Sequence, residues 1–256
     1  MSSGTAQVLF ARPGLRRRLR IRVSGLATIA RFLRDARGVT PRDCSVCGKH
    51  GRFAAYGQPP RLDAMCKSCG ALERHRLITL HLKRSGFLHP SHSLLHFAPE
   101  PMLRAILQGS VAKYDTADLR AGHGITHAVN IEATGLPAHS YDRIICNHVL
   151  EHVDDAKALA EMLRLLRPGG QVLLTTPVIE GWPETYENAA ITAPQDRVLH
   201  FGQHDHVRYF GRDLRDRIHA AGFHVAEVIA SAPDILKYGL ERGETLFIAT
   251  RPEEVT

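Results

Sequence analysis

The chain lacks any apolar run long enough to cross a bilayer. A membrane-spanning helix needs ~20 consecutive apolar residues, and the apolar stretches here are much shorter. The N-terminal region also lacks the apolar core and the small-residue cleavage site of a secretory signal. These absences exclude an integral membrane protein of the helical type, and we expect a cytoplasmic protein.

Lysine and acidic residues are scarce near the N-terminus. Residues 1–42 contain ten arginines, no lysine and one acid, Asp35, for a net charge of +9. Because the whole chain has +7, residues 43–256 have a net charge of −2. A nearly neutral body argues against a broad basic surface for nucleic acid. The basic residues therefore belong to an N-terminal arm, residues 1–41.

Apolar residues of this arm recur at helical spacing: Leu26, Ile29, Phe32 and Leu33. Arginines occupy other positions of the helical wheel, so the pattern is that of a basic amphipathic helix. Such a helix can lie on an anionic membrane surface, which would place the protein at the inner face of the membrane. The alternative is an arm that is partly disordered or that packs on the body.

Four of the five cysteines fall in one block, as two Cys-x-x-Cys pairs: Cys44, Cys47, Cys66 and Cys69. Eighteen residues separate the pairs, which is within the window for a four-cysteine zinc site. Two disulfides are the rival interpretation, but they require an oxidising compartment. We therefore expect a zinc ribbon at residues 42–70.

With four protein ligands, zinc has no open position for water or substrate, so its predicted role is structural. The ribbon either recognises a substrate or braces the rest of the protein, and bracing is the favoured role. The fifth cysteine, Cys146, lies inside an apolar segment and is expected in the core.

Strand and helix patterns alternate after the ribbon. The expected strands are 93–97, 111–117, 126–131, 141–147, 170–176, 223–230 and 245–250. The expected helices are 71–86, 101–108, 155–166 and 212–221. This alternation predicts a doubly wound α/β fold whose parallel strands bind ligands at their carboxyl ends.

Several motifs together resemble one enzyme family. SYDRIICNHVLEHV, followed by LRLLRPGGQVLLTTP, resembles the fourth and fifth strand regions of class I S-adenosylmethionine-dependent methyltransferases, nearest to the methyltransferase type 11 group. CSVCGK, CKSCGALERHRL, HFAPE, YDTADL and FGQHDHVRYFG resemble a bacterial subfamily with an N-terminal zinc ribbon. The resemblance covers most of residues 44–250. It implies a Rossmann-like, seven-stranded methyltransferase domain at residues 71–256, with an antiparallel hairpin at one end of the sheet.

The resemblance also implies where S-adenosylmethionine binds. HFAPEP replaces the glycine-rich turn after the first strand; that turn serves a pyrophosphate, which this cofactor lacks. The Ala98 carbonyl and the Glu100 carboxylate are expected to face the ammonium group of the cofactor. Asp118 is expected on the ribose hydroxyls and Asn130 on the adenine amine. The implied cofactor residues are Phe97, Ala98, Pro99, Glu100, Asp118, Leu119, Asn130, Ile131, Asn147 and His148.

Candidate catalytic groups gather in FGQHDHVRYFG, residues 201–211, after the fifth strand of the implied fold. A base that accepts the proton of the nucleophile is useful for methyl transfer to oxygen or nitrogen. The catalytic candidates are His148, His204, Asp205, His206 and Arg208. The alternative for this stretch is a polar surface loop.

His148, Glu151 and His152 share one face if their segment is helical. They resemble the Glu-x-x-Glu-His metal motif of ubiquinone-pathway O-methyltransferases, with His148 in place of the first Glu. Since Mg²⁺ prefers oxygen ligands, helix packing is favoured here over a catalytic divalent cation.

Three functions are compatible with these patterns. The favoured one is methyl transfer to an oxygen or nitrogen of a small molecule, a sugar or a lipid-linked saccharide. The first alternative is a ribosomal or transfer RNA base methyltransferase that uses the ribbon for RNA recognition. The second is a non-catalytic protein that binds the cofactor or works through its ribbon.

Overall fold

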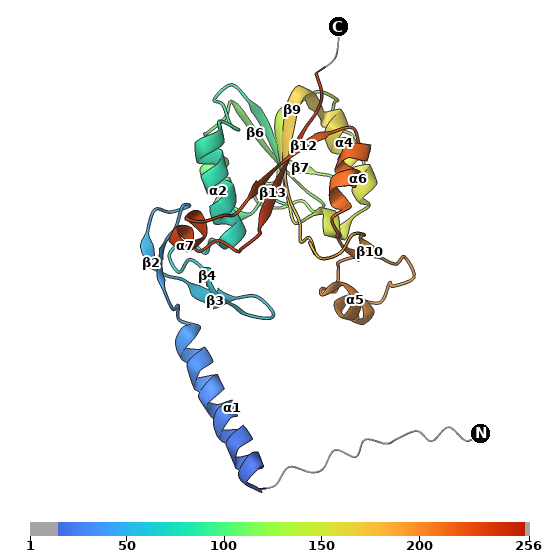
Figure 1. Ribbon diagram of the computed structural model, residues 1–256. Coiled ribbons are helices and arrows are strands. Elements are labelled where there is room, and N and C mark those ends of the chain that lie inside the picture. The colour runs from blue at the N-terminus through green and yellow to red at the C-terminus, as the bar shows by residue number, and fades with distance from the viewer. Residues whose placement is uncertain (1–14, 254–256) are drawn as a thin grey trace, which may run out of the picture.

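The computed structural model describes residues 15–253, with the side chains of residues 24–253. Figure 1 shows three parts: a long N-terminal helix, a small ribbon, and a sheet with helices on both faces. The ribbon lies below one edge of the sheet, between the long helix and the main body.

The main sheet has seven strands in the order β12-β13-β9-β8-β5-β6-β7. Their bounds are β5 Ser93–Phe97, β6 Lys113–Asp118, β7 His127–Ala128, β8 Tyr141–Asn147, β9 Leu166–Thr175, β12 His224–Ile229 and β13 Thr245–Thr250. Strand β5 pairs in parallel with β6 and β8, and β9 pairs in parallel with β8. Strand β13 lies antiparallel between β9 and β12. The predicted seven-stranded order with a terminal antiparallel hairpin is confirmed.

Three strands, β5, β8 and β13, have the bounds expected from the sequence. Strand β7 is shorter than the expected 126–131, because only Ala117 and Asp118 of β6 pair with it at the sheet edge. Strand β9 begins at Leu166, four residues earlier than expected, because Leu166 already pairs with Tyr141 of β8; the pairing resumes at Gln171 after an irregularity that contains Gly169, whose φ is 71°.

Helices cover both faces of the sheet. Their bounds are α2 Glu73–Ser85, α3 Pro101–Leu107, α4 Asp155–Leu165, α5 Pro194–Phe201, α6 Leu214–Ala220 and α7 Asp234–Tyr238, with the 3₁₀ helix η1 at Leu150–His152. Figure 1 shows α2 on one side of the sheet and α4 and α6 on the other.

Alternation along the strands divides the core into two apolar layers. Leu95 and Ile144 face the layer that contains α4 and α6, whereas Leu94 and Ile145 face the layer that contains α2 and α3. Cys146 is fully buried in the first layer, as expected. Burial on both faces makes the central strands rigid supports for groups at their ends.

Two small hairpins make up the ribbon: β1 Pro41–Asp43 with β2 His50–Arg52, and β3 Ala54–Tyr56 with β4 Arg61–Met65. The ribbon is bound to the body through Arg76 of α2, whose side chain is completely buried. Its guanidinium donates to the carbonyls of Ala64 and Ala71 next to the ribbon, at 2.9 and 2.8 Å. It also donates to those of Tyr238 and Gly239 at the end of α7, at 2.7 and 2.6 Å.

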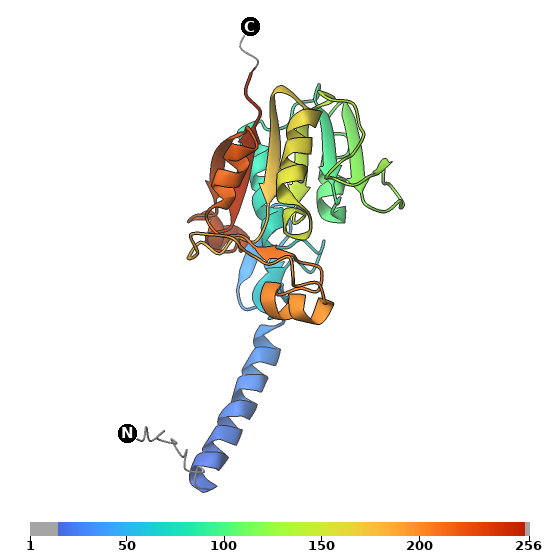
Figure 2. The same ribbon diagram turned by 90° about the vertical axis from the view of Figure 1, so that its right-hand side faces the viewer.

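Helix α1, Leu15–Asp35, precedes the ribbon. Figures 1 and 2 show it projecting from the ribbon with no other element beside it. The alternative in which the arm packs on the body therefore does not occur in the described residues. Within residues 15–253, no helix is both long enough and apolar enough to span a membrane.

Candidate functional site

The four ribbon cysteines lie together at two matching turns. Gly48 N donates to Cys44 O and Gly70 N donates to Cys66 O, both at 2.8 Å. The sulfur of Cys44 is 3.7 Å from that of Cys69, and the sulfurs of Cys47 and Cys66 are 3.8 Å apart. Tetrahedral Zn²⁺ with sulfur ligands at about 2.3 Å places neighbouring sulfurs at about this spacing. The four thiol groups therefore fit zinc and are too far apart for disulfides.

A second group of polar side chains lies where the strand order reverses, at the carboxyl ends of β5 and β8. Open α/β sheets bind ligands at this point. Two non-glycine residues here have left-handed backbone conformations, Ala98 with φ 45° after β5 and His148 with φ 52° after β8. Such strain concentrates at functional sites. Ala98 thus makes the turn that a glycine makes in a glycine-rich loop.

The predicted adenosine residues lie along the same edge. Asp118 ends β6, with Oδ1 accepting a bond from Arg120 N at 3.1 Å. Beside it, the Leu119 side chain is 72% exposed. Asn130 is exposed after β7 and its Oδ1 accepts a bond from Glu132 N at 3.0 Å, while Ile131 is buried. An exposed apolar side chain such as Leu119 can pack on a planar ring, and the carboxylate of Asp118 beside it can accept hydrogen bonds from two neighbouring hydroxyl groups.

Glu100 belongs to a charged cluster rather than standing alone. Its Oε1 is 2.6 Å from Arg74 Nη2 and 2.6 Å from His75 Nε2, and its Oε2 is 3.5 Å from Asn147 Nδ2. Burial raises the pKa of Glu100, but the hydrogen bond from His75 and the charge of Arg74 outweigh it and lower the pKa to about 2. Glu100 is therefore a carboxylate at neutral pH.

The other predicted residues after β5 have different surroundings. Phe97 is buried in the core and Pro99 is half-buried. They support the turn, whereas Glu100 and Arg74 present charge at its end. Arg74 lies within the CKSCGALERHRL motif but was not predicted as a site residue.

His148 and Glu151 form a hydrogen-bonded pair at the end of β8. His148 Nδ1 is 3.1 Å from Glu151 Oε1, and Thr176 Oγ1 donates to Glu151 Oε2 at 2.8 Å. Because a carboxylate only accepts, the proton of His148 lies on Nδ1. His148 Nε2 is buried and has no hydrogen-bond partner in the part of the chain that the structure describes. The pair therefore leaves one imidazole lone pair available.

The ionisation of Glu151 favours this arrangement. Its side chain is only 2% exposed. Burial raises its pKa, but the hydrogen bond from His148 outweighs this and leaves the pKa lowered. An ionised Glu151 can stabilise a positive charge that develops on His148.

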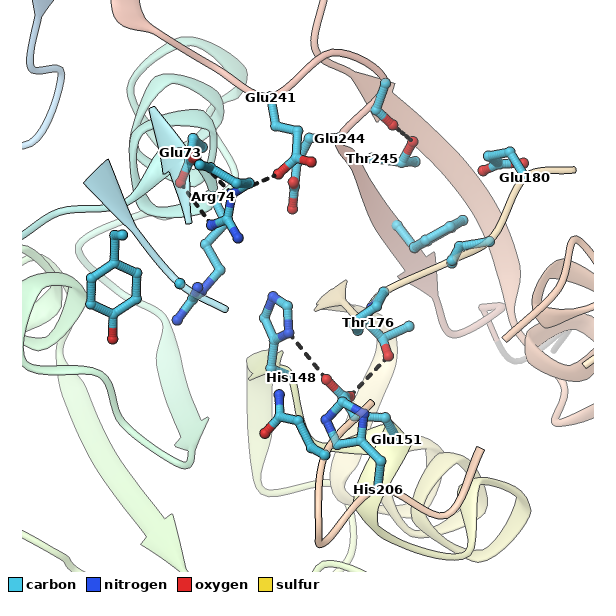
Figure 3. A pocket seen from close by; sticks show the side chains of 18 of the residues that line it. Glu73, Arg74, His148, Glu151, Thr176, Glu180, His206, Glu241, Glu244 and Thr245 are labelled. Carbon is cyan, nitrogen blue, oxygen red and sulfur yellow. Dashed lines mark hydrogen bonds and ion pairs between the residues drawn. The ribbon is translucent and has the colours of Figure 1, made fainter. Parts of the chain in front are cut away.

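A cavity of about 650 Å³ opens beside this pair, as Figure 3 shows. Its walls come from the ribbon, α2, the ends of β8 and β9, the loop after α5, and the loop before β13. The residues that line it include Tyr56, Gln58, Arg61, Glu73, Arg74, His148, Glu151, Thr176, Glu180, His206, Glu241 and Glu244. The cavity falls within the size range of small-molecule sites, and its lining is strongly polar.

The histidine-rich stretch divides between the cavity and the surface. His206 is 4% exposed and lines the cavity, with its ring edge-on to that of His152 at 4.7 Å between centroids. The His204 side chain is 73% exposed. Asp205 Oδ2 is 3.4 Å from His152 Nδ1. The structure thus brings His206 to the cavity and leaves His204 outside it.

Arg208 lies away from the cavity lining. Its guanidinium is 3.3 Å from Asp155 and 2.8 Å from Glu187, and it donates to the carbonyl of Leu150 at 2.9 Å. These contacts hold η1 and α4 against the loop that carries His206.

The segment after β8 differs from the regular helix that the sequence suggested. Glu151 and His152 belong to the short 3₁₀ helix η1, and His148 precedes it. Ligand atoms of Glu151, His152 and His206 lie within 4.8 Å of one another. Both Glu151 oxygens already accept bonds from residues outside this group, His148 and Thr176.

Comparison with known proteins is consistent with this site. The chain matches a family model described as "Methyltransferase domain" over residues 28–228. It therefore belongs to the methyltransferase domain family. Together with the strand order, this makes it a class I methyltransferase, the class that uses S-adenosylmethionine as methyl donor. No curated protein matches the chain.

Solved structures are similar in fold. The cyclase SpnF has 16% identity and a TM-score of 0.51, covering 70% of this chain and 81% of its own. An S-adenosylmethionine-dependent methyltransferase from Mesorhizobium loti has 16% identity and a TM-score of 0.47, covering 68% and 97%. The 1,6-didemethyltoxoflavin N1-methyltransferase of Burkholderia thailandensis has 16% identity and a TM-score of 0.45, covering 69% and 76%. At this identity the likeness shows the fold alone and does not identify the methyl acceptor.

Proposed function

We propose that this protein transfers a methyl group from S-adenosylmethionine to a hydroxyl oxygen of a sugar or a lipid-linked saccharide held in the cavity. The observation that carries the proposal is the His148–Glu151 pair, which lines the cavity at the end of β8 and whose Nε2 has no hydrogen-bond partner within the described residues. The four cysteines hold a structural Zn²⁺ in this proposal.

The crevice residues fit the parts of the cofactor. Asp118 would accept hydrogen bonds from the ribose hydroxyls, and Leu119 and Asn130 would hold the adenine. The Glu100 carboxylate and the Arg74 guanidinium form a pair of opposite charges, which complements an amino-acid group with its ammonium and carboxylate. When bound, S-adenosylmethionine supplies an electrophilic methyl group on a sulfonium.

His148 acts as the general base. Its Nε2 accepts the proton of the acceptor hydroxyl, while Nδ1–H keeps donating to Glu151, so the ring stays oriented and its positive charge is balanced. A positioned base is typically worth about 10²–10⁴-fold in rate. Thr176 holds the second Glu151 oxygen and prevents the carboxylate from turning away.

The cavity lining supports a hydroxyl-rich acceptor. Glu73, Glu180, Glu241 and Glu244 offer acceptors, and Arg61 and Arg74 offer donors. Arg61 already pairs with Glu73 and Glu241, and Glu180 pairs with Arg215. Their remaining donor and acceptor capacity suits a polyhydroxyl compound, whereas an apolar phenol ring would cover these charged groups without new hydrogen bonds. Tyr56, 48% exposed, presents a ring face against which a sugar ring can pack.

Glu244 in particular lacks a partner. Its carboxylate makes no hydrogen bond or ion pair within residues 24–253, and burial raises its pKa. A hydroxyl group of the acceptor would pair with it whether it is ionised or protonated. The carboxylates of the lining would repel the phosphates of RNA, which disfavours the RNA alternative.

The test combines a labelled-methyl assay with calorimetry. Sugars, phenols and RNA are offered as acceptors, and S-adenosylhomocysteine binding is measured separately. We expect turnover with sugars, and for His148→Ala a loss of about 10²-fold or more in kcat with unchanged S-adenosylhomocysteine affinity. The matched control His204→Ala, outside the cavity, should keep full turnover.

Each alternative has its own outcome. Turnover of RNA alone would replace the proposed acceptor with a nucleic acid. Binding of S-adenosylhomocysteine without turnover of any acceptor would support the non-catalytic alternative. No binding at all would refute both methyltransferase proposals.

A further inference from the structure

Helix α1 carries an apolar stripe that no other part of the described chain covers. Leu26, Ile29 and Leu33 are spaced three and four residues apart and so share one face of the helix. Their side chains are 68%, 57% and 62% exposed, and that of Phe32 beside them is 39% exposed. Neither view of the molecule places any other element against this face (Figures 1 and 2). An exposed apolar stripe of this kind marks an interaction surface.

Charge indicates what covers the stripe. The arm, residues 1–41, has nine arginines and one acid, and Arg31 and Arg34 project from other faces of α1 than the stripe. Asp35, the single acid, is already paired with Arg34 at 2.7 Å. A second copy of the arm would bring two +8 segments together, so self-association is opposed by repulsion. A surface that is both anionic and partly apolar can contact the arginines and the apolar stripe of the helix at the same time.

We propose that α1 binds the surface of an anionic lipid membrane. Its apolar stripe enters the boundary between head groups and acyl chains, and its arginines pair with lipid phosphates. This binding needs neither cofactor nor acceptor, so it is independent of the proposed methyl transfer.

The C-terminal end of α1 is fixed to the ribbon, so binding of the helix to a membrane would orient the rest of the protein. Ala55 N of β3 donates to Ala36 O at 2.9 Å, and Val39 N donates to Asp63 Oδ1 at 2.7 Å. Gly38 lies so close to the ribbon that an added Cβ would meet Phe53 O at 2.5 Å. The helix therefore positions the ribbon, and Tyr56 and Arg61 of that ribbon line the cavity. If the proposed methyl transfer holds, this arrangement suits an acceptor that is itself anchored in the membrane.

Sedimentation with lipid vesicles tests the proposal on the full, zinc-loaded chain. One set of vesicles contains phosphatidylcholine alone and the other adds phosphatidylglycerol. We expect binding to the anionic set, weakened by salt, and at least about tenfold weaker for the triple variant Leu26→Glu, Ile29→Glu, Leu33→Glu.

The control is a second triple variant with the same change of charge elsewhere on the surface. Val198, Leu199 and Leu236 are 51%, 81% and 59% exposed, and their replacement by Glu should leave vesicle binding unchanged. Both variants should retain zinc and S-adenosylhomocysteine affinity, which separates membrane binding from misfolding and from the proposed catalysis.

Three results would overturn the proposal. They are the absence of binding to anionic vesicles, equal binding to both vesicle sets, and undiminished binding by the α1 variant. Binding of the arm to RNA but not to vesicles would identify a nucleic-acid arm instead.

Discussion

The proposed cofactor crevice and the proposed acceptor cavity meet at His148 but are built in different ways. The crevice uses consecutive strand ends of one sheet, from Ala98 after β5 to Asn130 after β7. The cavity assembles walls from remote segments, including Tyr56 of the ribbon, His206 of the loop after α5, and Glu244 before β13. The first region depends on the sheet itself, and the second depends on additions to it. Substitutions should therefore separate donor binding from acceptor turnover.

The largest expected effect follows from removing one ribbon cysteine. Cys66→Ser removes one of the four thiolate ligands, so bound zinc should fall from one equivalent to nearly none. Structural zinc contributes about 10 kcal/mol or more to the folding of such small modules, so the ribbon should lose its fold as well. Since the ribbon forms a wall of the cavity, turnover should fall by about 10²-fold or more, a size that corresponds to about 3 kcal/mol. Metal analysis and the methyl assay measure both quantities.

The same variant should disturb the crevice much less, since its strands belong to the body. A tenfold or greater loss of S-adenosylhomocysteine affinity, about 1.4 kcal/mol, would contradict the separation of the two regions. Ser68→Ala, an exposed change within the same turn, is the control.

Asp118→Ala should act on the crevice alone. Removing a carboxylate that accepts ribose hydroxyls costs about 1.5–3 kcal/mol, so calorimetry should show S-adenosylhomocysteine binding weakened by roughly ten- to a hundredfold. kcat at saturating donor should be retained. Asp216→Ala, at an exposed acid away from the strand ends, should leave affinity unchanged. Equal affinity of the Asp118 variant and the wild type would show that the ribose lies elsewhere.

Tyr56→Ala should act on the cavity alone, and more mildly. Loss of one aromatic contact is worth about 1 kcal/mol, so steady-state kinetics should show an acceptor KM about fivefold higher at unchanged kcat. Leu62→Ala, on the same hairpin but outside this cavity, should have no effect. An unchanged KM for Tyr56→Ala would leave the ribbon with only a bracing role.

A further expected effect concerns stability and pH in the core beneath both regions. Burial lowers the pKa of His96 to about 4, and its Nδ1 is 2.9 Å from the Tyr114 hydroxyl. Below pH ~6.5 the unfolded chain binds a proton at His96 that the folded protein does not, so stability falls as the pH drops from ~6.5 towards ~4.

This contribution amounts to about 2 kcal/mol between pH ~6.5 and ~5. Denaturant unfolding of the wild type and of His96→Gln at both pH values should show the smaller decrease for the variant. Equal decreases would mean that His96 is protonated in the folded protein.

The strand ends that border the proposed crevice could be predicted from the sequence better than the walls of the cavity, for a physical reason. A strand and the turn after it are neighbours in the chain, so Asp118 and His148 could be placed from local patterns. Even there the conformation of Ala98 was not foreseen, because a left-handed alanine has no sequence signal. The charged contacts of Glu100 with Arg74 and His75 depend on the packing of α2 against β5, which local patterns do not reveal.

The cavity depends on contacts between distant segments, so composition was the main guide. The histidine-rich stretch was recognised as a unit, but burial separates its members: His206 lines the cavity, His204 is in solvent, and Arg208 pairs with Asp155. No pattern in the ribbon indicated that Tyr56 would reach the same cavity. Zinc spacing predicted the ribbon itself, since four thiolates around one ion constrain the chain strongly.

The buried guanidinium of Arg76 has an evolutionary consequence. The side chain donates hydrogen bonds to the carbonyls of Ala64 and Ala71 in the ribbon region. It also donates to the carbonyls of Tyr238 and Gly239, in the segment that leads to the loop before β13. Two walls of the cavity therefore share one anchor, and a substitution that shifts either wall strains the other. Acceptor preference should diverge among descendants through paired changes in these two segments, and grafting one without the other should produce misassembled hybrids.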